Sequence, residues 1–209
     1  TSRSRRTASP PLNSSVRRHR KMTTYQPYLD FTAQAKTVQA LMMLYSQFEK
    51  RDLAKIELLP FVVFMAFAIE AYLNSVGARK IEFWDELERL PWRSKVTILH
   101  KHAGRDPDWG KEPLQFAIEV FRIRDKLAHG KPERVIGPIC SSPTDADSYF
   151  STNRLEPDWY HSVTPDWVRS AKERFRVLMI YIGSLYGLHE SDHLHSASGG
   201  FMERSSDAA

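Results

Sequence analysis

Arg124, Asp125 and His129 are the residues whose types and spacing are best suited to chemistry. Histidine can remove or donate a proton near neutral pH, and arginine offers phosphate a planar fork of hydrogen-bond donors. An aspartate four residues before a histidine shares a helical face with it and can hold the imidazole in one orientation. These groups suit metal-independent cleavage of RNA, in which the 2′-hydroxyl attacks the adjacent phosphate.

The pattern assigns a role to each residue. We predict that Arg124 binds the scissile phosphate, that His129 is the general acid or base, and that Asp125 orients His129. Six residues separate Arg122 from His129, so Arg122 is a reserve phosphate ligand. One histidine cannot easily serve as both acid and base, so we expect a homodimer that brings two Arg–His pairs to one cleft.

The spacing alone is not specific, because arginine and histidine also occur at this distance by chance. The alternative interpretation is an ordinary exposed helix end, where Lys126 and His129 complement the helix dipole. The elements around the pattern therefore decide how much weight it carries.

Helical periodicity runs through most of the chain. Apolar residues recur at three- and four-residue steps over 25–50, which predicts an amphipathic helix. Residues 58–76 are apolar nearly all round and predict a central core helix, with Pro60 in its first turn and Gly77 as its C-cap. Shorter helices are predicted at 83–90 and 92–101, followed by a loop.

The second half of the chain begins with a helix from Pro113 that stops at His129-Gly130, with Pro132 just beyond. Residues 131–163 predict a long connection with a short strand at 134–139. Thr164 and Pro165 mark the N-cap and first position of a last helix, which ends near Tyr186. Trp159, in the long connection, is predicted to contact RNA together with Lys126 and Lys131.

These elements predict an all-α bundle of about five to six helices, with three segments along the chain. Residues 1–24 form a disordered basic tail or leader, 25–187 the helical domain, and 188–209 a flexible tail. The net charge of +5 includes seven basic side chains before Met22, so the remainder carries a net charge of −2. A vector-derived leader and a natural basic arm both fit residues 1–21.

The segment from Phe121 to Pro132, FRIRDKLAHGKP, resembles the signature of HEPN domains. In that family an arginine, usually followed by Asn, Asp or His, precedes a histidine by four to six intervening residues. The segment from Phe67 to Asn74 resembles the family's helix that bears a glutamate and an asparagine, here Glu70 and Asn74. The segment from Pro91 to Lys95 resembles its short lysine-containing stretch. The resemblance covers residues 25–187 in order and spacing.

The resemblance implies a helical bundle, commonly dimeric, with the Arg–His helices facing each other across a two-fold axis. Many HEPN domains are endoribonucleases of toxin–antitoxin or antiviral defence, and others are non-catalytic modules that bind a nucleotide, RNA or a protein. For this chain it implies RNA as substrate and an antitoxin or regulatory protein as partner. Glu70 and Asn74 are interpreted either as structural support or as a pair that orients Arg124, and Lys95 as a surface or salt-bridge lysine.

Other patterns in the sequence suggest a metal site, a disulfide or a membrane span, and the evidence for each is weaker. His189-Glu190-Ser191-Asp192-His193 matches the zinc-protease pattern, but a Ser/Gly-rich stretch follows it and no third ligand is in view. We therefore predict no metal and no cofactor. A single cysteine, Cys140, excludes an internal disulfide. The longest apolar run, 58–68, is too short to span a bilayer, which favours a cytoplasmic protein.

Overall fold

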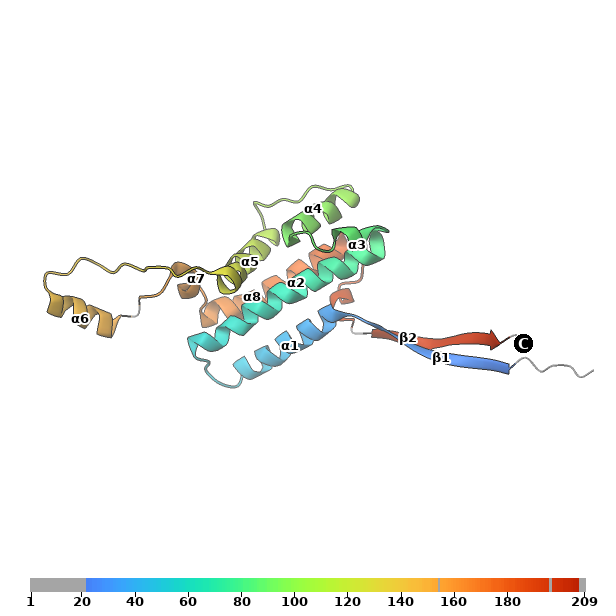
Figure 1. Cartoon of the computed structure of the whole chain (residues 1–209), viewed down its shortest axis with the longest axis horizontal. Helices are drawn as coiled ribbons and strands as arrows, with labels where there is room; N and C mark the ends of the chain where they lie inside the picture. Colours follow the sequence, from blue (N-terminus) through green and yellow to red (C-terminus); the bar gives the residue numbers. More distant parts are fainter. Residues whose placement is uncertain (1–21, 154, 196, 207–209) are drawn as a thin grey trace, which may run out of the picture. The chain divides into compact units, whose positions relative to one another are not determined.

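The computed structural model describes residues 22–153, 155–195 and 197–206. Within these residues the chain forms eight α-helices, two short 3₁₀-helices and one two-stranded sheet (Figure 1). It divides into two compact units, of which Asp30–Ser198 contains all of the helices. The prediction of a mainly helical protein is confirmed, with the small sheet as an addition. The predicted disorder of residues 1–21 concerns residues outside the described part.

Helix α2 (Leu59–Lys80) is the centre of the helical unit. Five other α-helices pack against it, namely α1 (Ala33–Phe48), α3 (Trp84–Leu87), α4 (Trp92–His102), α5 (Leu114–His129) and α8 (Pro165–Ser184) (Figure 1). Its buried side chains include Phe61, Met65 and Ile69. A helix surrounded by others must be apolar on most of its faces, as the sequence pattern of 58–76 indicated.

The segment Lys55–Lys80 is also long and apolar enough to cross a membrane, and it is the one such segment among the described residues. It comprises the 3₁₀-helix η1 (Lys55–Leu58) and α2. Half of its most apolar stretch is buried by the neighbouring helices. The expectation that the longest apolar run is too short to span a bilayer is therefore corrected, and the core helix of a bundle passes the same test of length and composition.

Local signals placed most helix ends correctly. Pro60 lies in the first turn of α2. The side-chain oxygen of Thr164 accepts a hydrogen bond from the backbone N–H of Trp167, and Pro165 opens α8. Helix α5 begins after Pro113 and ends at His129, as predicted. The Thr164 side chain thereby satisfies a backbone N–H that the helix itself leaves unpaired.

Gly77 is not the C-cap that the sequence suggested, because α2 continues to Lys80. The glycine serves a packing role instead. A Cβ atom at Gly77 would lie 2.1 Å from the ring of Trp84, which is buried in α3 (Trp84–Leu87). The missing side chain allows the indole to lie directly on the helix backbone.

At both ends of the predicted helical domain the structure has a strand that the sequence did not predict. β1 (Met22–Phe31) occupies the start of the helix predicted from residue 25, and β2 (Ala197–Ser206) lies in the predicted flexible tail. They pair with each other and run in opposite directions (Figure 1). Tyr25, Leu29 and Phe31 alternate with other residues, and this two-residue period favours a strand over a helix.

The long connection also differs from the prediction. The segment 134–139 is a loop rather than a strand. Two short helices follow, α6 (Pro143–Thr152) and α7 (Asp158–His161). Helix α6 has no buried residue, whereas α7 packs against α5. After α8 the chain forms the 3₁₀-helix η2 (Asp192–Leu194), which contacts α1 and α8.

Candidate functional site

Arg124 is held near the C-terminal end of α5 by two carboxylates. Its Nη1 lies 3.1 Å from Oδ1 of Asp125, and its Nη2 lies 3.8 Å from Oε2 of Glu70. Its guanidinium carbon lies 5.1 Å from the centre of the Phe121 ring, one turn earlier on the same helix. With 22% of the side chain exposed, the guanidinium is fixed in place and still reachable from solvent.

Glu70 connects Arg124 to a buried lysine. The ammonium of Lys95 donates to Oε1 of Glu70 at 3.2 Å, and the Lys95 side chain is only 2% exposed. The carboxylate of Glu70 thus joins three helices, α2, α4 and α5. Of the two interpretations of Lys95, a salt bridge is correct and a surface position is not.

Asn74 lies one turn after Glu70 on α2 and does not complete this network. Its Oδ1 is buried without a hydrogen-bond partner among the described residues, and the same holds for Nε of Arg124. No hydrogen bond joins Glu70 and Asn74 among the described residues. Buried polar atoms normally have partners, and here one donor and one acceptor beside the network have none among the described residues.

His129 is the last residue of α5, and its side chain is exposed. It forms no hydrogen bond or ion pair with any residue that the structure describes. The Asp125 carboxylate contacts Arg124 rather than His129. The arrangement thus combines an immobilised guanidinium with an imidazole that is free to meet a ligand. In these contacts Asp125 is the ion-pair partner of Arg124.

The surface next to Gly130, the residue after His129, contains two adjoining hollows with volumes of about 330 and 540 Å³, and neither His129 nor Arg124 lines them. Both are lined by Lys126, Glu133, Pro157 and Trp159, so we treat them together as the Trp159 hollow. Lys131 and Gly130 line the smaller part, and Arg122 lines the larger. The three residues predicted to contact RNA, Lys126, Lys131 and Trp159, therefore meet in one place, next to the residue that follows His129.

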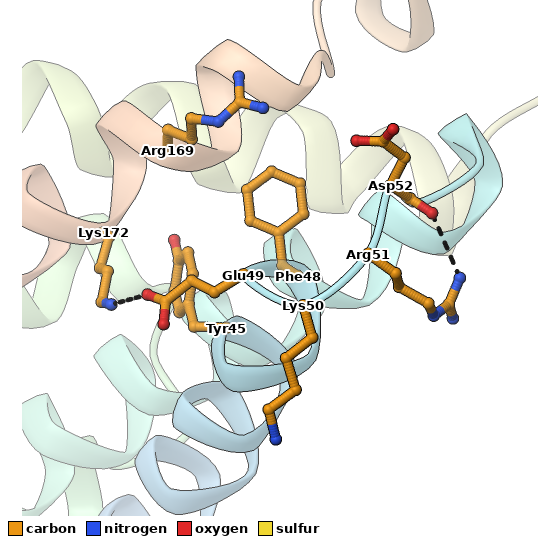
Figure 2. Close-up of a pocket in the computed structure, with 8 residues that line it drawn as sticks. All are labelled: Tyr45, Phe48, Glu49, Lys50, Arg51, Asp52, Arg169 and Lys172. Atoms are coloured by element: carbon orange, nitrogen blue, oxygen red, sulfur yellow. Dashed lines mark hydrogen bonds and ion pairs between the residues drawn. The ribbon is translucent and has the colours of Figure 1, made fainter.

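A third hollow, of about 660 Å³, lies between the end of α1 and the start of α8, and we call it the Phe48 hollow (Figure 2). Its basic side chains are mostly neutralised. Lys172 contacts Glu49 at 2.7 Å, as Figure 2 shows, and Arg51 contacts Glu57. This site was not predicted from the sequence. Its signal would have been the run Glu49-Lys50-Arg51-Asp52 directly after a helix.

Within the His189–His193 segment, Asp192 has a structural role. Asp192 accepts hydrogen bonds from the hydroxyl of Tyr72 at 2.9 Å and from both terminal nitrogens of Arg79. The guanidinium of Arg79 lowers the pKa of Asp192 below its usual value. Over the described ranges, no group of three or more His, Cys, Asp or Glu side chains is arranged to hold a metal ion. The segment therefore fastens η2 to α2.

Comparisons of the chain with protein-family models, with curated proteins and with solved structures found no match.

Proposed function

We propose that this chain is a metal-independent endoribonuclease of the HEPN type that acts as a homodimer on RNA. The observation that carries the proposal is the end of α5, where a guanidinium anchored by Glu70 and an exposed, unbonded imidazole lie five residues apart. Catalysis by preorganised groups requires the phosphate ligand to be fixed before the substrate binds. The Lys95–Glu70–Arg124 network supplies that fixation.

The proposed reaction breaks one bond of the RNA backbone. The 2′-hydroxyl attacks the adjacent phosphorus and the 5′-oxygen of the next nucleotide leaves, which gives a 2′,3′-cyclic phosphate and a 5′-hydroxyl. One His129 accepts the proton of the 2′-hydroxyl, and His129 of the second chain donates a proton to the leaving oxygen. Arg124 binds the phosphate and offsets the negative charge that develops on it. Arg122 is a second cation on the same helix.

The biological setting follows from this activity. An enzyme that cuts RNA in the cell must be controlled, and we propose a role in a toxin–antitoxin system or in antiviral defence. The partner would be an antitoxin or another regulatory protein, and the compartment would be the cytoplasm. This part of the proposal rests on the resemblance of residues 121–132 to the HEPN signature.

One observation favours a second candidate, a non-catalytic HEPN-like module that binds RNA, a nucleotide or a protein. Arg124 is already paired with Asp125 at 3.1 Å, so its guanidinium is partly occupied. Both candidates use the same face of the protein. They differ in whether His129 contributes to bond breaking.

Cleavage assays separate the two. Purified protein is incubated with labelled single-stranded RNA in the presence of a chelator, and wild type is compared with His129→Ala, Arg124→Lys and the control His189→Ala. His189 is also exposed but lies beyond α8. We expect His129→Ala to lose at least about 100-fold in rate, the lower range of acid–base catalysis, and His189→Ala to match wild type. Equal cleavage by all four proteins, or products ending in 3′-hydroxyl, would refute the enzyme.

A further inference from the structure

We infer that the Trp159 hollow is the binding site for an unpaired stretch of RNA next to the cleaved bond, with a base stacked on Trp159 and phosphates bound by Arg122, Lys131 and Arg134. The inference deepens the proposed function and rests on it for the identity of the ligand. It names the substrate class as single-stranded RNA, or a loop whose bases are free to turn outward.

The charges of the hollow support this ligand. Its four basic side chains are Arg122, Lys126, Lys131 and Arg134. Lys126 is neutralised by Glu133. The other three form no ion pair within the part of the chain that the structure describes. Unpaired cations that converge on one hollow attract a polyanion, because no intramolecular carboxylate has to be displaced.

The carboxylates of the hollow do not cancel this charge. Its acidic side chains are Glu133, Glu156 and Asp158. Glu133 is paired with Lys126, and Glu156 is paired with Lys55 of η1. Asp158 is thus the one unpaired carboxylate against three unpaired cations among the described lining residues. The net excess is positive, with Lys131 in the smaller part of the hollow and Arg122 and Arg134 in the larger part.

Trp159 provides the apolar surface for a base. It is half-buried, packs against the core beside α5 and lies 5.7 Å from Tyr160 between ring centres. Pro157 and Pro132 form stiff walls of the smaller hollow. A rigid aromatic surface flanked by cations is how proteins bind single strands, since every base offers a face for stacking. A base in a duplex is already stacked and paired on both sides and cannot reach it.

The Phe48 hollow shows why the Trp159 hollow is preferred. Its volume exceeds that of either part of the Trp159 hollow, yet Arg51, Arg169 and Lys172 are each paired with a carboxylate. Arg169 and Lys172 also lie over the rings of Phe48 and Tyr45, which covers the aromatic surface (Figure 2). Neither phosphate nor base finds free partners there, apart from Lys50.

The position beside His129 links the hollow to the reaction. Gly130 and Lys131 follow His129 directly, and Lys126 precedes it by less than one turn of α5. An RNA strand whose base lies on Trp159 therefore has a neighbouring phosphate at the C-terminal end of α5. Stacking at this point would choose which phosphodiester meets Arg124 and His129.

Binding is measured with the cleavage-deficient His129→Ala protein, so that the RNA stays intact. Fluorescence anisotropy compares a labelled single-stranded oligoribonucleotide with the same sequence in a perfect duplex. In this background Trp159→Leu keeps an apolar side chain but removes the stacking surface, and Trp109→Leu is its control. Trp109 is also half-buried against the core. It lies near α4, where the guanidinium of Arg93 covers its ring. Thermal unfolding checks that both variants fold.

We expect Trp159→Leu to weaken single-strand binding by about 5- to 150-fold, the effect of losing one stacked base. Trp109→Leu should leave it unchanged. Lys131→Ala and Arg134→Ala should each reduce the slope of log affinity against log salt by about 0.7, the value for one phosphate of a single strand. Lys50→Ala, an unpaired lysine of the Phe48 hollow, is the control for charge.

The results distinguish the inference from the proposed function. Suppose that wild type cleaves RNA through His129 while Trp159→Leu and Lys131→Ala bind RNA as tightly as their control variants do. The inference about the hollow is then wrong, and the proposed endoribonuclease activity is supported. If His129→Ala cleaves as well as wild type while Trp159→Leu loses single-strand binding, the enzyme fails and the hollow remains an RNA site. Equal affinity for duplex and single strand, or no binding of either, overturns the inference.

Discussion

Removal of the Glu70 carboxylate should destabilise the protein, because it leaves the ammonium of Lys95 in the core without a counter-charge. Lys95 is 2% exposed, so water cannot replace the lost partner. Breaking a buried ion pair from one side costs about 3–5 kcal/mol. Glu70 itself is 35% exposed, which screens the pair. We therefore expect Glu70→Gln to lower the free energy of unfolding by about 3 kcal/mol.

Urea unfolding followed by circular dichroism measures this change directly, and thermal unfolding should show a midpoint lower by about 6–12 °C for a unit of this size. Glu173→Gln is the matched control. Glu173 pairs with Arg176 on the surface, with 64% and 54% of the two side chains exposed. Its loss should change the free energy of unfolding far less than the loss of Glu70 does, because water screens an exposed pair. If the two variants unfold at the same urea concentration, the network does not stabilise the fold.

The double variant Glu70→Leu with Lys95→Met separates stability from positioning. It replaces the pair by apolar side chains, which generally restores stability to near that of wild type. Arg124, however, loses its partner on α2 in this variant. We expect a folded protein whose RNA cleavage is reduced. Full cleavage by this stable variant would show that Arg124 needs no anchor.

Three further changes test the packing and the pairs away from the site. Gly77→Ala should destabilise the protein by about 1–3 kcal/mol in urea unfolding, because the new methyl group would overlap the buried Trp84 ring; unchanged stability would contradict the packing described. Tyr45→Phe removes a hydrogen bond of 3.0 Å to the buried carbonyl of Val168 and should cost about 1 kcal/mol, whereas an unchanged midpoint would show that the bond contributes nothing. Because Arg79 lowers the pKa of Asp192 from 3.8, the stability that this carboxylate contributes is present above about pH 4 and is lost as the pH falls further. Asp192→Asn should therefore be less stable than wild type at neutral pH, and the two should converge in acid; a constant difference would refute the assignment.

Features encoded within a few residues could be predicted from the sequence. Thr164 and Pro165 start a helix by local hydrogen bonding and ring geometry, and Gly130 and Pro132 end one. The apolar pattern of α2 marked it as the central helix. Each of these signals acts between near neighbours along the chain, so no knowledge of the tertiary structure is needed to interpret it.

Features that depend on distant partners were missed. β1 and β2 pair residues about 180 positions apart, as Thr24 and Arg204 show, and neither strand is recognisable from its own ends. For Lys95 the surface and the salt-bridge interpretations both stayed open, because its partner Glu70 lies 25 positions earlier on another helix. Gly77 resembled a helix end because the ring that covers it belongs to α3. Tertiary contacts override local preference in each case.

The contacts of Asp125 decide how the candidate site would work. The sequence assigned this carboxylate to His129, but it lies 3.1 Å from Arg124 and is 54% exposed. An exposed ion pair contributes at most about 1 kcal/mol, whereas a charge-assisted bond to phosphate contributes about 1.5–3 kcal/mol. A phosphate could therefore displace Asp125 from Arg124 while Glu70 keeps the guanidinium in place.

Asp125→Asn separates the two roles. If Asp125 competes with phosphate for Arg124, the variant should bind single-stranded RNA several-fold more tightly and retain its pH–rate profile. Asp125 could instead orient His129, or favour its protonated form, once RNA is bound. Cleavage by Asp125→Asn should then fall and its pH–rate profile should shift, because the imidazole loses a neighbouring carboxylate. Affinity is measured in the His129→Ala background and cleavage in the parent protein. Weaker binding with unchanged cleavage would contradict both roles and return Asp125 to the ordinary surface of a helix.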